Sequence, residues 1–256
     1  LLSVKTYFQT HYFFIFVINK HGKVIKNLQN IYICKVTGLI SRVMKNFILF
    51  LSSILLTGVV NAQDSLTVFY RIRLDQDIDK AAQRLVVTGL EKAAENDADY
   101  VILDLDTYGG AVDAADSIRT ALLRYPKPVI AYVNLQAASA GALISIACDS
   151  IYMKTGSSIG AATVVDQSGK VMPDKYQSFM RGMMRSTASA TGRDPHIAES
   201  MVDTANVLSL TPEEAVKVGY CEGIYEDEVE VAEAVSGDKE FVIKNMEDDM
   251  TWVDRL

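Results

Sequence analysis

The residues best suited to chemistry form a short run of small side chains around one serine. Residues 137–142 read Ala-Ala-Ser-Ala-Gly-Ala, and Ser139 precedes an apolar stretch, 140–147, that predicts a helix. The hydroxyl of a serine between small residues is accessible, and the first N–H groups of a helix have no partner within it. Such N–H groups can hold the oxyanion of an acyl-transfer reaction. Ser139 is therefore a candidate nucleophile, although such a run taken alone more often serves close helix packing.

A pair of glycines supplies a second candidate part of the same site. Tyr108-Gly109-Gly110 follows the apolar run 100–105, which predicts a buried strand. Paired glycines allow a tight strand-to-helix turn, and they can also present backbone N–H groups to a substrate carbonyl. Taken alone, the turn fits both roles equally. Together with Ser139, we expect Ala140 and either Gly109 or Gly110 to supply the donors of an oxyanion hole.

A serine nucleophile needs a general base, and histidine is scarce after residue 62. The single histidine there is His196, which follows a proline in a pattern more typical of a helix start than of a base. The other candidates are Lys154, Lys170 and Lys175, of which Lys175 opens an amphipathic pattern over 176–190. A free lysine amine has a pKa near 10.4, so a lysine base must be desolvated by apolar neighbours. Those that the sequence offers to Lys175 are Met172, Tyr176 and Phe179. Ser158 is a candidate to orient the amine, although a serine in a helix or turn is the safer interpretation.

The elements around these residues alternate between strand-like and helix-like patterns. Strands are expected at 66–72, 100–105, 128–133 and 151–154, and helices at 78–94, 111–123, 140–147 and 176–190. This alternation predicts an α/β fold. Ligand sites in such folds lie at the carboxyl ends of the strands, which is where the glycine pair and Ser139 fall. The two candidate parts are therefore expected to converge.

Charge divides the chain into a basic opening and an acidic body. Residues 1–62 hold seven of the 25 Lys and Arg residues and no Asp or Glu, which leaves 18 basic and all 32 acidic residues for the rest, a formal balance of −14. An acidic body does not suit nucleic acid. About 190 residues are enough for one domain with a substantial core.

The basic opening has the layout of a secretory signal. Met44-Lys45 precedes the apolar run 47–60, and small residues precede Ala62. A 14-residue helix spans about 21 Å, short of the roughly 30 Å hydrocarbon core, so a permanent membrane anchor is the weaker interpretation. We expect a signal peptide at 44–62 that is cleaved after Ala62, and an upstream leader at 1–43 that does not contribute to the fold.

Cysteine adds little to the functional prediction. Cys34 lies in the expected leader, and Cys148 and Cys221 are too far apart in sequence to suggest a zinc site or a redox pair. We expect two buried thiols.

Four segments together resemble the membrane-associated serine proteases of the NfeD or stomatin-operon-partner type, in the Clp-protease class. They are 103–110, 137–141, 158–161 and 208–215, within a matching region of about 66–235. The resemblance implies a Clp-protease/crotonase-like layered α/β fold with repeated β-β-α units. It implies a serine endopeptidase with Ser139 as nucleophile and Lys175, which precedes the pair Gly192-Arg193, as base. No metal or other cofactor is implied.

The resemblance also implies partners and a location. The substrate would be a protein or peptide, in particular an apolar segment of a stomatin-like membrane protein. The protein would be a homo-oligomer that is exported to the periplasm or to the outer face of the inner membrane.

The sequence departs from the family pattern at three points. Tyr108 stands where the family usually has proline, and the segment 156–175 is shorter than usual. Full-length members continue into membrane spans and a β-barrel domain, whereas nothing after Ala62 is apolar enough to span a bilayer. We therefore divide the remainder into a protease domain, 63–240, and a tail, 241–256, of a truncated or stand-alone protease.

Two other functions stay open. A crotonase-like enzyme would act on acyl thioesters through the same oxyanion hole, but it would want a carboxylate base, and no acidic residue lies near Ser139 before Asp149. A catalytically inactive adaptor would keep the fold in order to bind a membrane protein.

Overall fold

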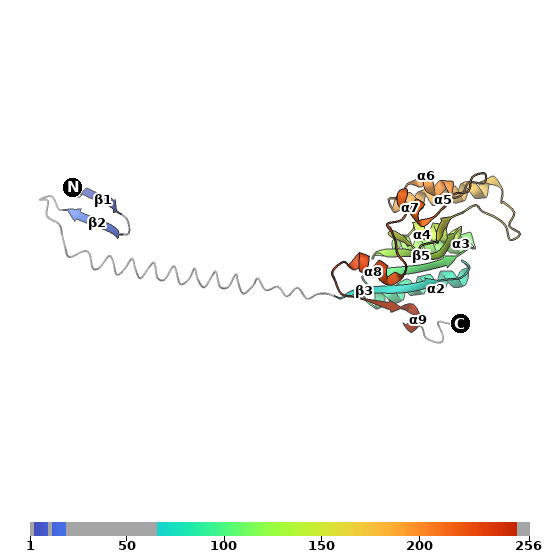
Figure 1. The fold of residues 1–256 in the computed structure, drawn as a ribbon, viewed down its shortest axis with the longest axis horizontal. Coiled ribbons are helices and arrows are strands. Elements are labelled where there is room, and N and C mark those ends of the chain that lie inside the picture. The colour runs from blue at the N-terminus through green and yellow to red at the C-terminus, as the bar shows by residue number, and fades with distance from the viewer. Residues whose placement is uncertain (1–2, 10–11, 19–65, 250–256) are drawn as a thin grey trace. The chain divides into compact units, whose positions relative to one another are not determined.

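The computed structural model describes residues 3–9, 12–18 and 66–249 (Figure 1). The chain divides into two units, residues 1–63 and 64–256. In the first unit, β1 (Ser3–Gln9) pairs antiparallel with β2 (Tyr12–Ile18). The signal peptide expected at 44–62 and its cleavage site lie outside the described residues. Among the residues that are described, no helix is both long enough and apolar enough to cross a membrane.

The second unit is built on a sheet whose main path is parallel throughout. Its strand order is β10-β3-β4-β5-β6-β9, and β7 continues the sheet from the end of β5, with β8 antiparallel to β7. The strands are β3 (Thr67–Leu74), β4 (Tyr100–Thr107), β5 (Val129–Ala138), β6 (Ser150–Met153), β7 (Ser158–Gly160), β8 (Ser209–Leu210), β9 (Gly223–Ile224) and β10 (Phe241–Asn245). The predicted α/β fold is confirmed.

Helices cover both faces of this sheet. They are α2 (Lys80–Glu95), α3 (Val112–Arg124), α4 (Ala140–Ile146), α5 (Asp174–Ala190), α6 (Pro195–Ser200), α7 (Pro212–Lys217), α8 (Glu228–Ser236) and α9 (Met246–Asp249). Successive strand side chains point to opposite faces. Thus Tyr70 and Ile72 join the larger apolar core with α2 to α5, whereas Phe69 joins a smaller one with Val231 and Ala232 of α8.

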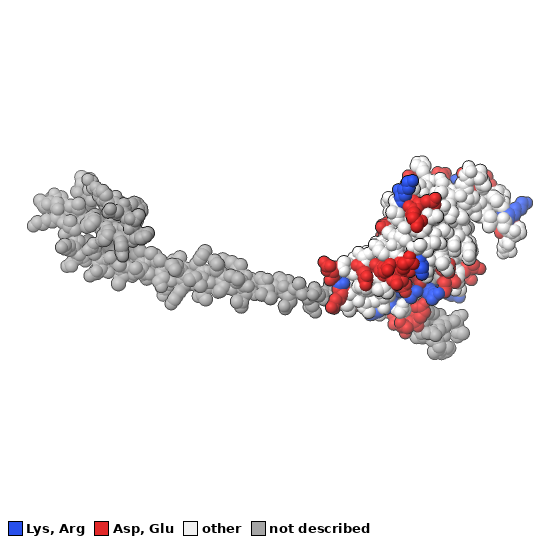
Figure 2. Space-filling model, in the orientation of Figure 1, with Lys and Arg blue, Asp and Glu red and all other residues white. Residues whose placement is uncertain are grey.

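A partly buried set of ion pairs fastens α8 to its face of the sheet. The Arg71 Nη2 atom lies 2.5 Å from Asp104 Oδ2, and its Nη1 atom lies 2.8 Å from Glu228 Oε1. The Asp104 side chain is 2% exposed, and a carboxylate that is removed from water needs such a partner. Figure 2 shows that acidic side chains outnumber basic ones on the face in view, as the charge balance predicts.

The structure corrects three sequence-based expectations. The strand expected at 128–133 continues to Ala138, so it delivers Ser139 directly into α4. Ser158 lies in strand β7, not in a helix or turn. The tail expected at 241–256 begins with β10, which pairs with β3 and adds a strand to the sheet edge. Short strands such as β7 and β10 depend on partners distant in sequence, so their local patterns are weak.

Candidate active site

Ser139 occupies the turn between β5 and α4 in an unusual backbone conformation. Its φ is 56° and its ψ is −113°, a region that residues other than glycine rarely adopt. Neighbouring backbone holds it there, because the Ser139 N–H donates to the Gly160 carbonyl at 2.8 Å and the Ser139 carbonyl accepts from the Ala142 N–H at 3.1 Å. The residue is half-buried, and its hydroxyl makes no hydrogen bond to any residue that the structure describes. Such enforced strain is typical of functional sites.

The glycine pair lies against this serine. A β-carbon added to Gly109, whose φ is 109°, would lie 2.7 Å from the Ser139 β-carbon and 3.1 Å from the Ala140 nitrogen. A β-carbon on Gly110 would lie 2.3 Å from the Ile78 carbonyl oxygen. Backbone hydrogen bonds from Ile78 N–H to Gly109 and from Ala111 N–H to Ile78, at 2.8 and 2.7 Å, fix the turn. The structure therefore brings the two predicted parts of the site together.

The Thr107 hydroxyl fixes the glycine turn through two hydrogen bonds to backbone. The Thr107 Oγ1 atom donates to the Gln76 carbonyl at 2.7 Å and accepts from the Gly109 N–H at 3.1 Å. Among the described residues, the N–H groups of Gly110 and Ala140 have no hydrogen-bond acceptor. A substrate oxygen held by Ala140 would take its second donor from Gly110 directly, or from Gly109 after that N–H leaves Thr107.

Lys175 stands in the first turn of α5 and is exposed to solvent. Its Nζ atom lies 4.9 Å from the ring centroid of Tyr176, and no hydrogen bond joins it to Ser139. It lines an open groove together with Val112, which follows the glycine pair by two residues, and with Phe179. Lys175 therefore shares a groove with the start of α3, but no hydrogen bond joins it to Ser139.

Gln177 anchors the segment that carries Lys175. Its side chain is buried and makes three hydrogen bonds to backbone: Nε2 donates to the carbonyls of Val164 at 2.7 Å and Met172 at 3.1 Å, and Oε1 accepts from the Val164 N–H at 2.9 Å. These bonds close the base of the 164–172 loop onto α5. They fix the first turn of the helix next to the groove.

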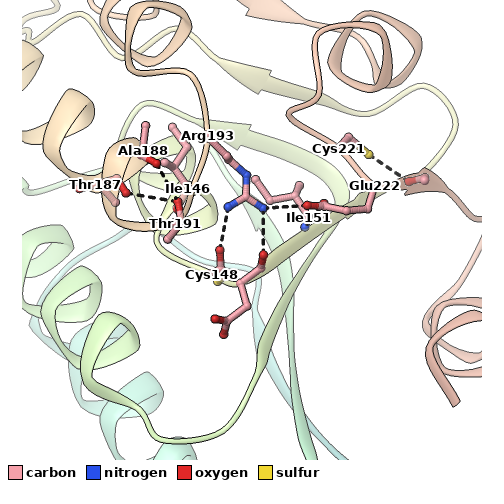
Figure 3. Close-up of polar contacts among 11 residues, drawn as sticks. Ile146, Cys148, Ile151, Thr187, Ala188, Thr191, Arg193, Cys221 and Glu222 are labelled. Carbon is pink, nitrogen blue, oxygen red and sulfur yellow. Dashed lines mark hydrogen bonds and ion pairs between the residues drawn. The ribbon is translucent and has the colours of Figure 1, made fainter.

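A second set of polar contacts joins the far ends of the two helices that begin at Ser139 and near Lys175 (Figure 3). The Thr191 hydroxyl, just after α5, donates to the Ile146 carbonyl at the end of α4 at 2.9 Å. The buried Arg193 guanidinium donates to the Cys148 carbonyl at 2.9 Å and to Glu222 Oε1 at 3.2 Å. The ends of α4 and α5 are thus held to one another, and Glu222 links them to β6 because its Oε2 atom accepts from the Ile151 N–H at 2.6 Å.

The other candidate residues from the sequence are not part of this site. His196 is the second residue of α6, and its N–H donates to the capping Asp194 at 2.8 Å, as expected of a helix start. The Ser158 hydroxyl donates to Gln136 Oε1 at 2.8 Å. Lys170 is exposed in the 164–172 loop, and Lys154 follows β6, where its N–H donates to the Val133 carbonyl.

The two thiols of the body are buried and unpaired, as expected. Burial raises the pKa of Cys148 well above its ordinary value, and it raises the pKa of Cys221 to about 11. Within the described ranges, no group of three or more His, Cys, Asp or Glu side chains is arranged to hold a metal ion.

Sequence reasoning did not identify three residues that build this site. Thr107, Gln177 and Arg193 are buried polar side chains that hold the glycine turn, the first turn of α5 and the end of α5. A signal for Gln177 existed, since it interrupts the apolar face of an amphipathic helix. Arg193 belonged to the Gly192-Arg193 pair, which was used only to locate Lys175.

The chain is similar to known proteins over most of its second unit. A family described as NfeD1b, N-terminal domain, matches residues 68–244. The membrane protein NfeD1b of Bacillus subtilis is 34% identical over 187 residues, which are 68% of this chain and 42% of that protein. The membrane-bound protease PH1510 of Pyrococcus horikoshii is 36% identical over 155 residues, 57% of this chain and 35% of that protein. The chain thus spans less than half the length of the curated relatives it matches.

Solved structures show the same fold. A lysine-to-alanine variant of the 1510-N membrane-bound stomatin-specific protease, in complex with a substrate peptide, aligns with a TM-score of 0.67 at 26% identity, covering 75% of this chain and 96% of that one. A serine-to-alanine variant of 1510-N aligns with a TM-score of 0.65 at 27% identity, covering 70% and 98%. ClpP1 from Listeria monocytogenes, at 19% identity and a TM-score of 0.50 over 66% of this chain and 95% of its own, shares the fold. The Clp-protease-like fold and the family resemblance inferred from sequence are confirmed.

The spacing of the exchanged residues in 1510-N is comparable with that of the two candidates here. The serine and lysine exchanged in those variants are 41 positions apart (138 minus 97). Ser139 and Lys175 are 36 positions apart (175 minus 139).

Proposed function

The chain belongs to the NfeD1b family, whose N-terminal domain matches residues 68–244. On this premise we propose that it is a serine endopeptidase with a Ser139 and Lys175 dyad. The observation that carries the proposal is the conformation of Ser139. A free serine hydroxyl stands on a strained strand-to-helix turn, beside the unpartnered N–H of Ala140 and the glycine turn. This is an arrangement suited to acyl transfer.

The reaction would proceed through an acyl-enzyme. The Ser139 Oγ atom attacks the peptide carbonyl carbon while the neutral Lys175 amine takes its proton, and the N–H groups of Ala140 and of Gly109 or Gly110 hold the oxyanion. The carbon–nitrogen bond then breaks as Lys175 returns the proton to the leaving amine. Water, deprotonated by Lys175, hydrolyses the ester and restores Ser139. No cofactor enters these steps.

The names of the relatives support the proposed substrate class. One relative is named a membrane-bound protease, and a solved relative is named stomatin-specific and binds a substrate peptide. We therefore assign to this chain a peptide substrate in an apolar segment of a stomatin-like membrane protein. Its place of action would be the periplasm or the outer face of the inner membrane, as a homo-oligomer.

One observation favours a second candidate, an inactive adaptor that binds a membrane protein. Lys175 is exposed and makes no hydrogen bond to Ser139, whereas a lysine base needs an environment that disfavours its charged form. The experiment below separates the two functions.

The test is intact-mass detection of a fluorophosphonate adduct on the full chain. We expect one adduct on the parent protein and on Lys170→Ala, whose lysine is exposed in the adjacent loop, and none on Ser139→Ala or Lys175→Ala. Far-UV circular dichroism controls for folding. An adduct that survives in Lys175→Ala would exclude Lys175 as the base. A folded parent protein that takes no adduct would favour the adaptor.

A further inference from the structure

An open groove lies between the N-terminal parts of α3 and α5. It has a volume of about 610 Å³, within the range of sites that bind small ligands. Its lining is mainly apolar and comes from both helices and the 164–172 loop: Val112, Val164, Tyr176, Phe179, Met180 and Met183, with Asp113, Asp116 and Lys175. The two aromatic side chains are unusually open to water, since Phe179 is 62% and Tyr176 is 41% exposed. The groove is therefore a preformed apolar surface that has no cover within the described part of the chain.

The position of the groove near the candidate active site indicates that a side chain of a bound peptide could enter it. Val112 lines the groove and is only two residues beyond Gly110 in the chain, so the groove starts close to the candidate oxyanion hole. Lys175 lines the same groove. A peptide whose carbonyl is held by the glycine turn would bring a neighbouring side chain to this groove. An apolar side chain fits its mainly apolar lining.

The acidic side chains of the groove are already paired. Asp113 lies 3.0 Å from Lys80, and Asp116 lies 2.6 Å from Arg119. On the helix of Lys175 itself, Asp174 lies 2.9 Å from Arg181. These carboxylates each have a cation of their own, so none of them depends on Lys175 as its only counterion.

The Lys175 amine is open to water while the groove is empty. The amine is exposed, and it lies 4.9 Å from the Tyr176 ring centroid, within the range of a cation–π contact. An apolar side chain seated against Tyr176 and Phe179 would exclude water from this amine. Loss of water disfavours the ammonium and favours the neutral amine that a general base requires.

We propose that this groove binds an apolar side chain of the substrate next to the cleaved bond, and that this side chain covers Lys175 and so completes the catalytic base. The inference rests on the proposed peptidase function. Selectivity for apolar substrates would then appear in the rate of the chemical step, because the cover is needed for proton transfer and not only for affinity.

The first test measures the cover directly, without catalysis. The full-length Ser139→Ala protein is acetylated with an N-hydroxysuccinimide ester, with and without an excess of a peptide of alanines carrying a central leucine, and the lysines are followed by mass spectrometry. We expect acetylation of Lys175 to slow at least about fivefold, while Lys170, which does not line the groove, reacts unchanged. A peptide with serine in place of leucine is expected to protect neither. Equal rates at Lys175 with and without the leucine peptide would overturn the proposal.

The second test measures selectivity at the serine. Peptide diphenyl phosphonates with a leucine-like or a glycine-like side chain at the reacting phosphorus are compared by their rates of adduct formation on Ser139. We expect the leucine probe to react at least about tenfold faster, and Phe179→Asn to reduce that ratio to about twofold. Val216→Asn, a matched change of an exposed apolar side chain outside the groove, should leave the ratio unchanged. A ratio that persists in Phe179→Asn would overturn the proposal.

The two tests also separate this proposal from the proposed function. Adducts on Ser139 without protection of Lys175 or without selectivity would leave a serine peptidase and remove the role of the groove. Protection of Lys175 without any adduct on the parent protein would remove the peptidase and support the groove as a binding site for apolar peptide.

Discussion

Gly109 packs against Ser139 so closely that a β-carbon added to the glycine would lie 2.7 Å from the β-carbon of the serine. Atoms at that separation cannot remain where they are, and φ of 109° is unfavourable for any residue with a side chain. The conformation of the glycine turn and that of the candidate nucleophile are thus mutually dependent.

Gly109→Ala is expected to displace Ser139 and the Ala140 N–H. We predict that the rate of fluorophosphonate labelling falls at least about a hundredfold, the usual effect of losing an oxyanion donor, with a loss of about 1–3 kcal/mol in the free energy of unfolding from the strained backbone. The control is Gly219→Ala, which also has positive φ but no atom within 4 Å of the added carbon. If both variants label like the parent protein, the turn does not take part in the reaction.

Thr107→Val tests whether the hydroxyl under the glycine turn positions it. The change removes the donor to the Gln76 carbonyl and the acceptor of the Gly109 N–H at a site that is 2% exposed. We predict a loss of about 1–3 kcal/mol in the free energy of unfolding in urea, and slower labelling of Ser139. Thr107→Ser keeps the hydroxyl and should keep most of the labelling rate. Slow labelling in both variants would implicate the methyl group instead.

Gln177→Leu tests the anchor of the first turn of α5. The variant loses three hydrogen bonds and leaves the polar groups of Val164 and Met172 without these partners. We predict a loss of about 2–3 kcal/mol in the free energy of unfolding, and faster hydrogen exchange in the 164–172 loop. Gln83→Leu, which removes one solvent-exposed contact to Lys80, should change stability by less than about 0.5 kcal/mol. Unchanged exchange in the loop would contradict the anchoring role.

The contacts of Arg193 predict unequal effects for the two partners of its ion pair. The Arg193 side chain is 3% exposed and the Glu222 side chain 41%. Arg193→Met leaves the buried Cys148 carbonyl without its donor, so we predict a loss of about 2–3 kcal/mol in the free energy of unfolding. Glu222→Gln should cost about 1 kcal/mol, since solvent reaches that side chain. Equal losses by chemical denaturation would show that the ion pair, and not the buried carbonyl contacts, carries the stability.

The raised pKa of Cys221 predicts a pH dependence of stability. Burial raises this pKa from 9.0 to about 11, so the unfolded chain releases the proton at a lower pH than the folded chain does. The full contribution of the thiol is present below pH 9, and it is lost as pH rises from 9 toward 11. We predict that Cys221→Ala flattens this part of the curve of unfolding free energy against pH. An unchanged slope would show that other groups cause the decline.

Much of the fold follows from local sequence patterns. The strands around Tyr100–Leu105 and the helices before and after the glycine pair were predicted within a few residues, because their apolar periodicity reflects burial that the structure realises. The end of β5 was not, since Asn134 and Gln136 break its pattern while pairing with neighbouring strands maintains the strand. The edge strand β10 was missed because β3, its strand partner in the described part of the chain, lies far away in sequence.

The sequence by itself determined which chemical groups meet in this protein. The types and order of the glycine pair, Ser139 and the following helix place a nucleophile and backbone donors at the carboxyl ends of neighbouring strands. Only the tertiary structure decided the backbone conformation of Ser139 and the solvent exposure of Lys175. The positive φ of Ser139 is imposed by hydrogen bonds to Gly160 and Ala142, and the exposure of Lys175 results from an open groove between two helices. Backbone strain and solvent exposure are properties of the surroundings, so no local pattern of residue types specifies them.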